Sequence, residues 1–169
     1  ALFVRGAFWL MLLLMVCAGA SEQAMAQWAS LFAEMGLGVS KTMGDLLGPC
    51  AFAVLMGSAR VFFASKGAHL PLTRILTISA VLCVASYLLA VFSPVPVLSL
   101  VGCAICGLSV GAMWPATISL SSRAFPQGGT AMFAMLAFAG DLGCASGPGL
   151  VGVVSSRVEA GVHWVQVLF

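Results

Sequence analysis

Five apolar runs, each long enough to cross a lipid bilayer, constrain the fold of this chain more than any other feature. They cover about residues 3–32, 43–64, 75–92, 97–120 and 130–154. A transmembrane helix needs about 20 mostly apolar residues. Because lipid offers the backbone no hydrogen-bond partners, runs of this length must be helical. The alternating pattern of a membrane-spanning strand does not occur in them. The sequence therefore predicts an all-α polytopic membrane protein.

The composition excludes the soluble classes of protein. The 169 residues include only seven Lys or Arg and five Asp or Glu, and 62% of them are hydrophobic. A soluble domain of this length carries roughly 40 charged residues. It also cannot bury so much apolar surface, because part of its surface must face water. We therefore exclude a soluble enzyme domain, a disordered segment and a nucleic-acid-binding module, and we expect no nucleic acid as a partner.

Short connections join the runs, so residues 1–169 are expected to form a single transmembrane unit. Turn-forming segments that contain Gly or Pro lie at residues 36–38, 93–96 and 126–129. A new apolar run begins near Trp164, where we expect a sixth helix to start. The chain begins with Ala1 and ends within that run, and we therefore expect it to be a fragment of a longer protein.

The basic residues predict the orientation in the membrane. Loops that face the cytoplasm are enriched in Lys and Arg. If the chain crosses the membrane five times, five basic residues lie on one side and two on the other. Arg60 is counted with the first group because it lies at the expected end of the second span. The first group is Arg5, Arg60, Lys66, Arg74 and Arg123, and the second is Lys41 and Arg157. We predict a multi-pass protein of the cell (inner) membrane with a cytoplasmic N-terminus.

Ionisable residues at membrane depth are the strongest functional signal. Each one is costly in lipid, and such residues tend to mark a transport path. Glu22 lies in the middle of the first run, and Gln23 and Gln27 share a helix face beside it. Asp141 lies about eleven residues into the fifth run. We expect these side chains to line a polar cavity.

Glycine and proline patterns predict how the helices pack. Glycines four residues apart at 44–48, 107–111 and 143–147 allow helix backbones to approach closely in lipid. Pro49, Pro115 and Pro148 lie within three of the expected helices, where proline removes a hydrogen bond and favours a kink. All six cysteines lie within apolar runs, so we expect free thiols and neither a metal site nor a cofactor.

Three segments resemble a known family. Residues 107–115 (GLSVGAMWP), residues 139–152 (AGDLGCASGPGLVG) and the basic loop at 60–74 are similar to the C-terminal half of major facilitator superfamily transporters. In that comparison the five runs correspond to helices seven to eleven of twelve. Within the superfamily, the chain resembles sugar-permease-like members, including the fucose permease group.

The resemblance implies secondary active transport of a small polar solute, a sugar being one class, by alternating access. It also implies four partners: the solute, the lipid bilayer, the missing N-terminal half of the same transporter and a coupling proton. A non-transporting assembly or structural subunit remains the alternative, and an enzyme is not expected because the two histidines lie in loops. Asp141 is added to the residues that the resemblance implies, because it lies near the middle of its membrane span. The candidate substrate-binding residues are therefore Glu22, Gln23, Gln27, Trp28, Trp114 and Asp141. For Trp114, packing between helices is an equal alternative to stacking on a solute.

The orientation can be tested with an impermeant thiol reagent. In the full-length protein without its native cysteines, Lys41→Cys should be labelled in intact cells. Lys66→Cys should be labelled only after the membrane is permeabilised, because the five-to-two distribution of basic residues places it inside. Labelling of position 66 in intact cells would reverse the predicted topology.

Overall fold

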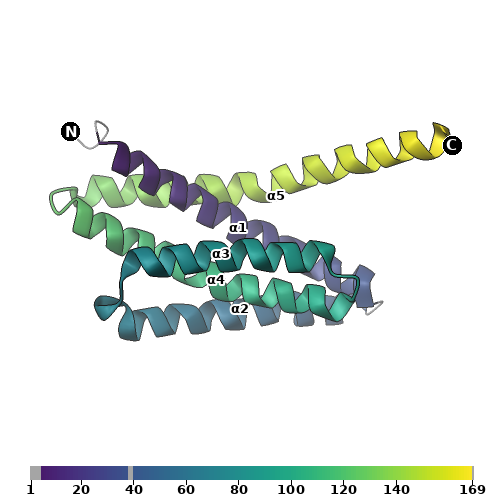
Figure 1. Ribbon diagram of the computed structural model, residues 1–169, viewed down its shortest axis with the longest axis horizontal. Helices are drawn as coiled ribbons and strands as arrows, with labels where there is room; N and C mark the ends of the chain where they lie inside the picture. Colours follow the sequence, from purple (N-terminus) through teal and green to yellow (C-terminus); the bar gives the residue numbers. More distant parts are fainter. Residues whose placement is uncertain (1–4, 38–39, 169) are drawn as a thin grey trace.

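Long α-helices joined by short connections make up the chain in a computed structural model (Figure 1). The structure describes residues 5–37 and 40–168, and the side chains of residues 5–29, 40–67, 69–95 and 97–157. A short 3₁₀ helix, η2 (Gly67–His69), follows α2. The five long helices are α1 (Gly6–Leu37), α2 (Lys41–Lys66), α3 (Leu72–Phe92), α4 (Pro96–Ala124) and α5 (Gly129–Leu168).

Every one of these long helices contains a segment that is long and apolar enough to cross a membrane. The segments range from 21 residues in α3 to 29 residues in α5. Many large apolar side chains remain exposed, among them Val61, Phe92 and Phe138. Exposed apolar surface of this extent is stable next to lipid and not next to water. The predicted all-α, five-span membrane fold is confirmed.

The expected start of a sixth helix at Trp164 is not observed. Instead, α5 continues without a break through Arg157 and Trp164 to Leu168. No glycine or proline interrupts residues 162–168, so no local residue ends the helix there. Figure 1 shows the C-terminal part of α5, in yellow, extending away from the other helices.

Helix α4 lies at the centre of the bundle, and α1 connects it to α5. α4 packs against α1, α2 and α3, whereas α1 packs against α2, α4 and α5. Figure 1 shows α1 crossing the bundle between α5 on one side and α2 on the other. Helix α1 therefore has α2 on one flank and α5 on the other, and its polar side chains can meet residues of either helix.

The predicted glycine-mediated packing is confirmed at several contacts. A Cβ atom built on Gly143 would collide with the backbone of Val16 and Ala20, so α5 and α1 touch backbone to backbone. A Cβ on Gly48 would lie 2.6 Å from the carbonyl oxygen of Ala29, which brings α2 equally close to α1. Without an aqueous hydrophobic effect between lipid-embedded helices, this close van der Waals contact is what holds them together.

Sulfur-containing side chains fill much of the interior. Cys83, Cys103 and Cys106 are buried between α3 and α4 in one apolar cluster, while Met15 and Met132 belong to a second cluster between α1, α4 and α5. All six cysteines are free thiols, as predicted. They behave as small apolar groups that fill space.

The bundle has one strongly basic end. Arg5 begins the described chain at the same end as Lys66, where α2 ends, and Arg123, where α4 ends. The Arg5 guanidinium lies 5.9 Å from the centre of the Phe125 ring, so the first helix and the fourth are joined there. Which end faces the cytoplasm stays a prediction.

Two glycines of α5 provide a matched test of this packing. Gly143→Ala should lower the free energy of unfolding by about 1–3 kcal/mol, because its methyl group collides with the α1 backbone. Gly149 has no atom within 4 Å of a built Cβ, so Gly149→Ala should be neutral or stabilising by up to about 1 kcal/mol. Unfolding midpoints of the purified full-length protein measure both, and equal midpoints would contradict the close α1–α5 contact.

Candidate transport site

An ion pair within the membrane-spanning region joins α1 to α2. Nη2 of Arg60 donates hydrogen bonds to both carboxylate oxygens of Glu22, at 3.1 Å to Oε1 and 3.2 Å to Oε2. The Glu22 side chain is 15% exposed and the Arg60 side chain 46% exposed. The carboxylate is therefore enclosed, whereas much of the guanidinium remains open.

The pair forms because the two helices are antiparallel and in close contact. Gly48 lies against Ala29, and α2 then runs back beside α1 toward the basic end. Arg60 lies six residues before Lys66, the last residue of α2, and so is inside the span and not at its end. The sequence had placed it near the end of the second span, about one and a half turns closer to the end of α2. No pattern in the sequence indicated that Glu22 and Arg60, 38 residues apart, would meet.

A second carboxylate lies on the other flank of α1. Cys144 of α5 packs against Gly19 of α1, and both Glu22 and Asp141 lie close enough to act electrostatically on Cys144. Asp141 is exposed and Gln23 is half-buried. Residues 19, 22 and 23 share one helix face. We name the group formed by Glu22, Gln23 and Arg60 the polar face; Asp141 belongs to α5, on the other flank of α1.

The three other candidate residues lie elsewhere. Gln27 is exposed one turn beyond Gln23. Trp28 lies beside Gly152 of α5, with its Cζ2 atom 3.8 Å from a Cβ built on that glycine. Trp114 packs against Gly140 and joins the apolar cluster between α1, α4 and α5. Both tryptophans thus contact α5 glycines, and a role in stacking on a solute stays a prediction.

Helix α4 carries a buried polar stripe that sequence analysis missed. Trp114 Nε1, Thr117 Oγ1 and Ser121 Oγ have no hydrogen-bond partner within the described part of the chain. By contrast, the buried hydroxyls of Ser86 and Ser109 donate to backbone carbonyls three residues earlier. Spacings of three and four residues place the stripe on one side of α4. In the sequence, only the spacing of Thr117 and Ser121 from Trp114 indicated that the three side chains share one side of a helix.

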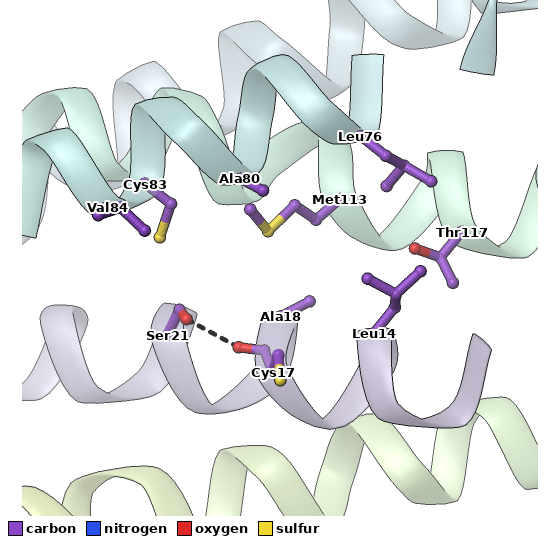
Figure 2. Close-up of a pocket in the computed structure, with 10 residues that line it drawn as sticks. All are labelled: Leu14, Cys17, Ala18, Ser21, Leu76, Ala80, Cys83, Val84, Met113 and Thr117. Carbon is purple, nitrogen blue, oxygen red and sulfur yellow. Dashed lines mark hydrogen bonds between the residues drawn. The ribbon is translucent and has the colours of Figure 1, made fainter. Parts of the chain in front are cut away.

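An apolar cleft lies between α1 and α3, with α4 behind it (Figure 2). It encloses about 190 Å³, and Met113 and Thr117 of α4 point into it. The Ser21 hydroxyl, on its α1 wall, donates to the Cys17 carbonyl at 2.7 Å. None of the six candidate residues lines this cleft. It is therefore separate from the polar face and unsuited to a polar solute.

The comparison with protein families identifies the fold. The family model described as Major Facilitator Superfamily matches residues 1–148. The chain belongs to the major facilitator superfamily. No curated protein and no solved structure matches it. The family consists of membrane transporters, so this superfamily member is a multi-pass membrane protein with a role in solute transport.

The polar face is the candidate site of this superfamily member, and its binding of a solute stays a prediction. It combines one guanidinium, one carboxylate and one side-chain amide at membrane depth, where such groups are retained for function or pairing. No group of three or more potential metal ligands occurs among the described residues. The available chemistry is hydrogen bonding and ion pairing.

The Glu22–Arg60 pair can be tested by removing one or both charges. Arg60→Gln leaves the enclosed Glu22 carboxylate unpaired, and we expect the free energy of unfolding to fall by about 1–3 kcal/mol. This is less than for a fully buried pair, because Arg60 is nearly half exposed. The double variant Glu22→Gln/Arg60→Gln should recover most of the loss, measured as the unfolding midpoint of the purified protein. Equal midpoints for the single and double variants would show that the two charges are not coupled.

Proposed function

We propose that this chain takes part in secondary active transport of a small polar solute by alternating access. The observation that carries the proposal is the Glu22–Arg60 ion pair, enclosed on its acidic side and open on its basic side. An ion pair within lipid costs several kcal/mol in desolvation unless it is compensated. A charged pair with this desolvation cost is retained where it has a function. With the Gln23 amide beside it, the Glu22–Arg60 pair is suited to binding a polar solute.

The proposal includes the position of the chain in a larger transporter. We place it as the C-terminal half, helices seven to eleven, working against an N-terminal half that supplies the opposite wall of the cavity. A coupling proton drives transport, and the protein lies in the cell membrane with its basic end in the cytoplasm. Arg5, Lys66 and Arg123 at one end of the bundle support this orientation.

A sugar is the substrate class implied by the likeness to the fucose permease group. The amides of Gln23 and Gln27 can donate to and accept from sugar hydroxyls, and both side chains reach the surface of α1. Trp28 and Trp114 give weaker support, because each packs against a glycine of α5.

One observation favours the alternative of a structural subunit. The Glu22 carboxylate is already bonded to Arg60, and this bond could serve only to hold α1 against α2. A structural role and a transport role make opposite predictions for the amount of folded protein and for its activity, so one experiment separates them.

Solute flux through the full-length transporter should be measured per molecule inserted in the membrane. Glu22→Gln keeps an oxygen that accepts a hydrogen bond from Arg60, so folded yield should change little while flux falls about tenfold or more. Gln27→Ala removes an exposed amide and should behave similarly. Ser58→Ala, at an exposed hydroxyl bonded to its own helix, is the control and should leave both quantities unchanged. Lower yield with normal flux per molecule would establish the structural role.

A further inference from the structure

We propose that Cys83 and Cys106 form a reversible oxidation site, at which a hydroperoxide converts the two thiols into a disulfide that joins α3 to α4. Both residues are free thiols in this structure. The site uses none of the residues of the polar face, and its test requires no solute. It is therefore independent of the proposed transport function.

The two thiols meet across the interface between α3 and α4. The Cys106 thiol donates a hydrogen bond to the Cys83 sulfur, and both residues belong to the same buried apolar cluster. A thiol is a weak donor and a weak acceptor, so this hydrogen bond contributes little to stability. Its consequence is chemical, because it holds two sulfur atoms next to each other.

The packing of the two helices brings these positions to the same level. A Cβ atom built on Gly102 would lie 2.8 Å from the backbone nitrogen of Ala90 and 2.9 Å from the carbonyl oxygen of Ser86, so the helix backbones touch. A short connection makes α3 and α4 antiparallel, and Cys106 is therefore level with about residue 84 of α3. A disulfide needs Cα atoms about 4.4–6.8 Å apart. Helices in backbone contact at this level can meet that condition.

Cys83 is the thiol that an oxidant reaches first. It lines the apolar cleft between α1 and α3, and Figure 2 shows its side chain extending from α3 toward the cleft. The cleft encloses about 190 Å³, which is ample room for a molecule as small as hydrogen peroxide. Cys106 lies behind it and is 0% exposed.

The surroundings of Cys83 favour its reaction with a peroxide. The thiolate is the nucleophilic form of cysteine. Besides the Cys106 thiol, the hydroxyls of Ser21 and Ser109 lie within hydrogen-bonding range of the Cys83 sulfur. These hydroxyls can rotate to donate to the sulfur when it is charged, since a charged acceptor forms the stronger hydrogen bond.

The oxidation is balanced in two steps. The Cys83 sulfur attacks one oxygen of hydrogen peroxide, the O–O bond breaks, and the other oxygen leaves as water with the thiol proton, which produces a sulfenic acid. The Cys106 sulfur then attacks the Cys83 sulfur, the S–O bond breaks, and a second water leaves with the Cys106 proton. The two thiols lose two electrons in total, and the peroxide gains them. A dithiol reductant reverses the reaction.

Cys103 provides an internal control for this assignment. It is also 0% exposed and belongs to the same cluster. However, it precedes Cys106 by three residues and is therefore level with about residue 87 of α3, about one turn from Cys83. We expect Cys103 to remain a thiol under conditions that oxidise the pair.

Mass spectrometry of the full-length protein in lipid nanodiscs tests the proposal. The protein is treated with hydrogen peroxide and denatured, its free thiols are blocked with light N-ethylmaleimide, and the oxidised thiols are then reduced and blocked with the heavy form. We expect Cys83 and Cys106 to acquire the heavy label together, about tenfold or more above Cys103. Without reduction, a peptide pair joined by the Cys83–Cys106 disulfide should be recovered. Dithiothreitol added before blocking should return both residues to the light label.

Variants assign a role to each thiol, with dimedone as the trap for a sulfenic acid. In Cys106→Ala the second step cannot occur, so dimedone should accumulate on Cys83. In Cys83→Ala the buried Cys106 should stay unlabelled. Cys103→Ala is the matched control and should form the disulfide as the unchanged protein does. The pairing itself is decided in the unchanged protein, so the test stands even if a variant fails to fold.

Three outcomes would overturn the proposal. In the first, Cys83 and Cys106 keep the light label at peroxide concentrations that oxidise Cys17 and Cys50, which are exposed. In the second, Cys106 is recovered in a disulfide with Cys103. In the third, dimedone labels Cys106 in Cys83→Ala as strongly as it labels Cys83 in Cys106→Ala.

Discussion

The low polarity of the bilayer is the constraint on which the rest of this structure depends. It requires every backbone amide to be bonded within its own helix, which produces long helices joined by short turns. It also removes the hydrophobic effect as a force between helices, so that association depends on close contact. Gly48 and Gly143 provide that contact by bringing α2 and α5 against the backbone of α1.

Those same glycine contacts position the polar side chains. Because α2 touches α1 at Gly48, Arg60 is carried beside Glu22, whereas Asp141 lies on α5 at the other flank of α1. In water, an ion pair between partly exposed side chains contributes little to stability. Between lipid-embedded helices, an uncompensated carboxylate is costly, so the arrangement of Glu22 and Arg60 links packing directly to the chemistry of the site.

The two polar features of the bundle are suited to different tasks. The polar face combines charges of both signs and reaches the surface, which suits the binding and release of a solute. The stripe on α4, with Thr117 and Ser121, is buried without hydrogen-bond partners among the described residues and lies beside the apolar residues of α1. A buried hydroxyl without a partner costs free energy, because its desolvation is not repaid by a hydrogen bond.

By itself, the sequence determined the fold class, the five spans, the free thiols and the glycine contacts, because length, apolar composition and small-residue spacing act locally along a helix. It also identified Glu22 and Asp141, since a charge in an apolar run is visible without a structure. It did not determine the pairing of Glu22 with Arg60, the position of Arg60 within the span or the buried stripe on α4. These depend on which helices touch and at what level, and residues 38 positions apart meet only when the bundle has formed.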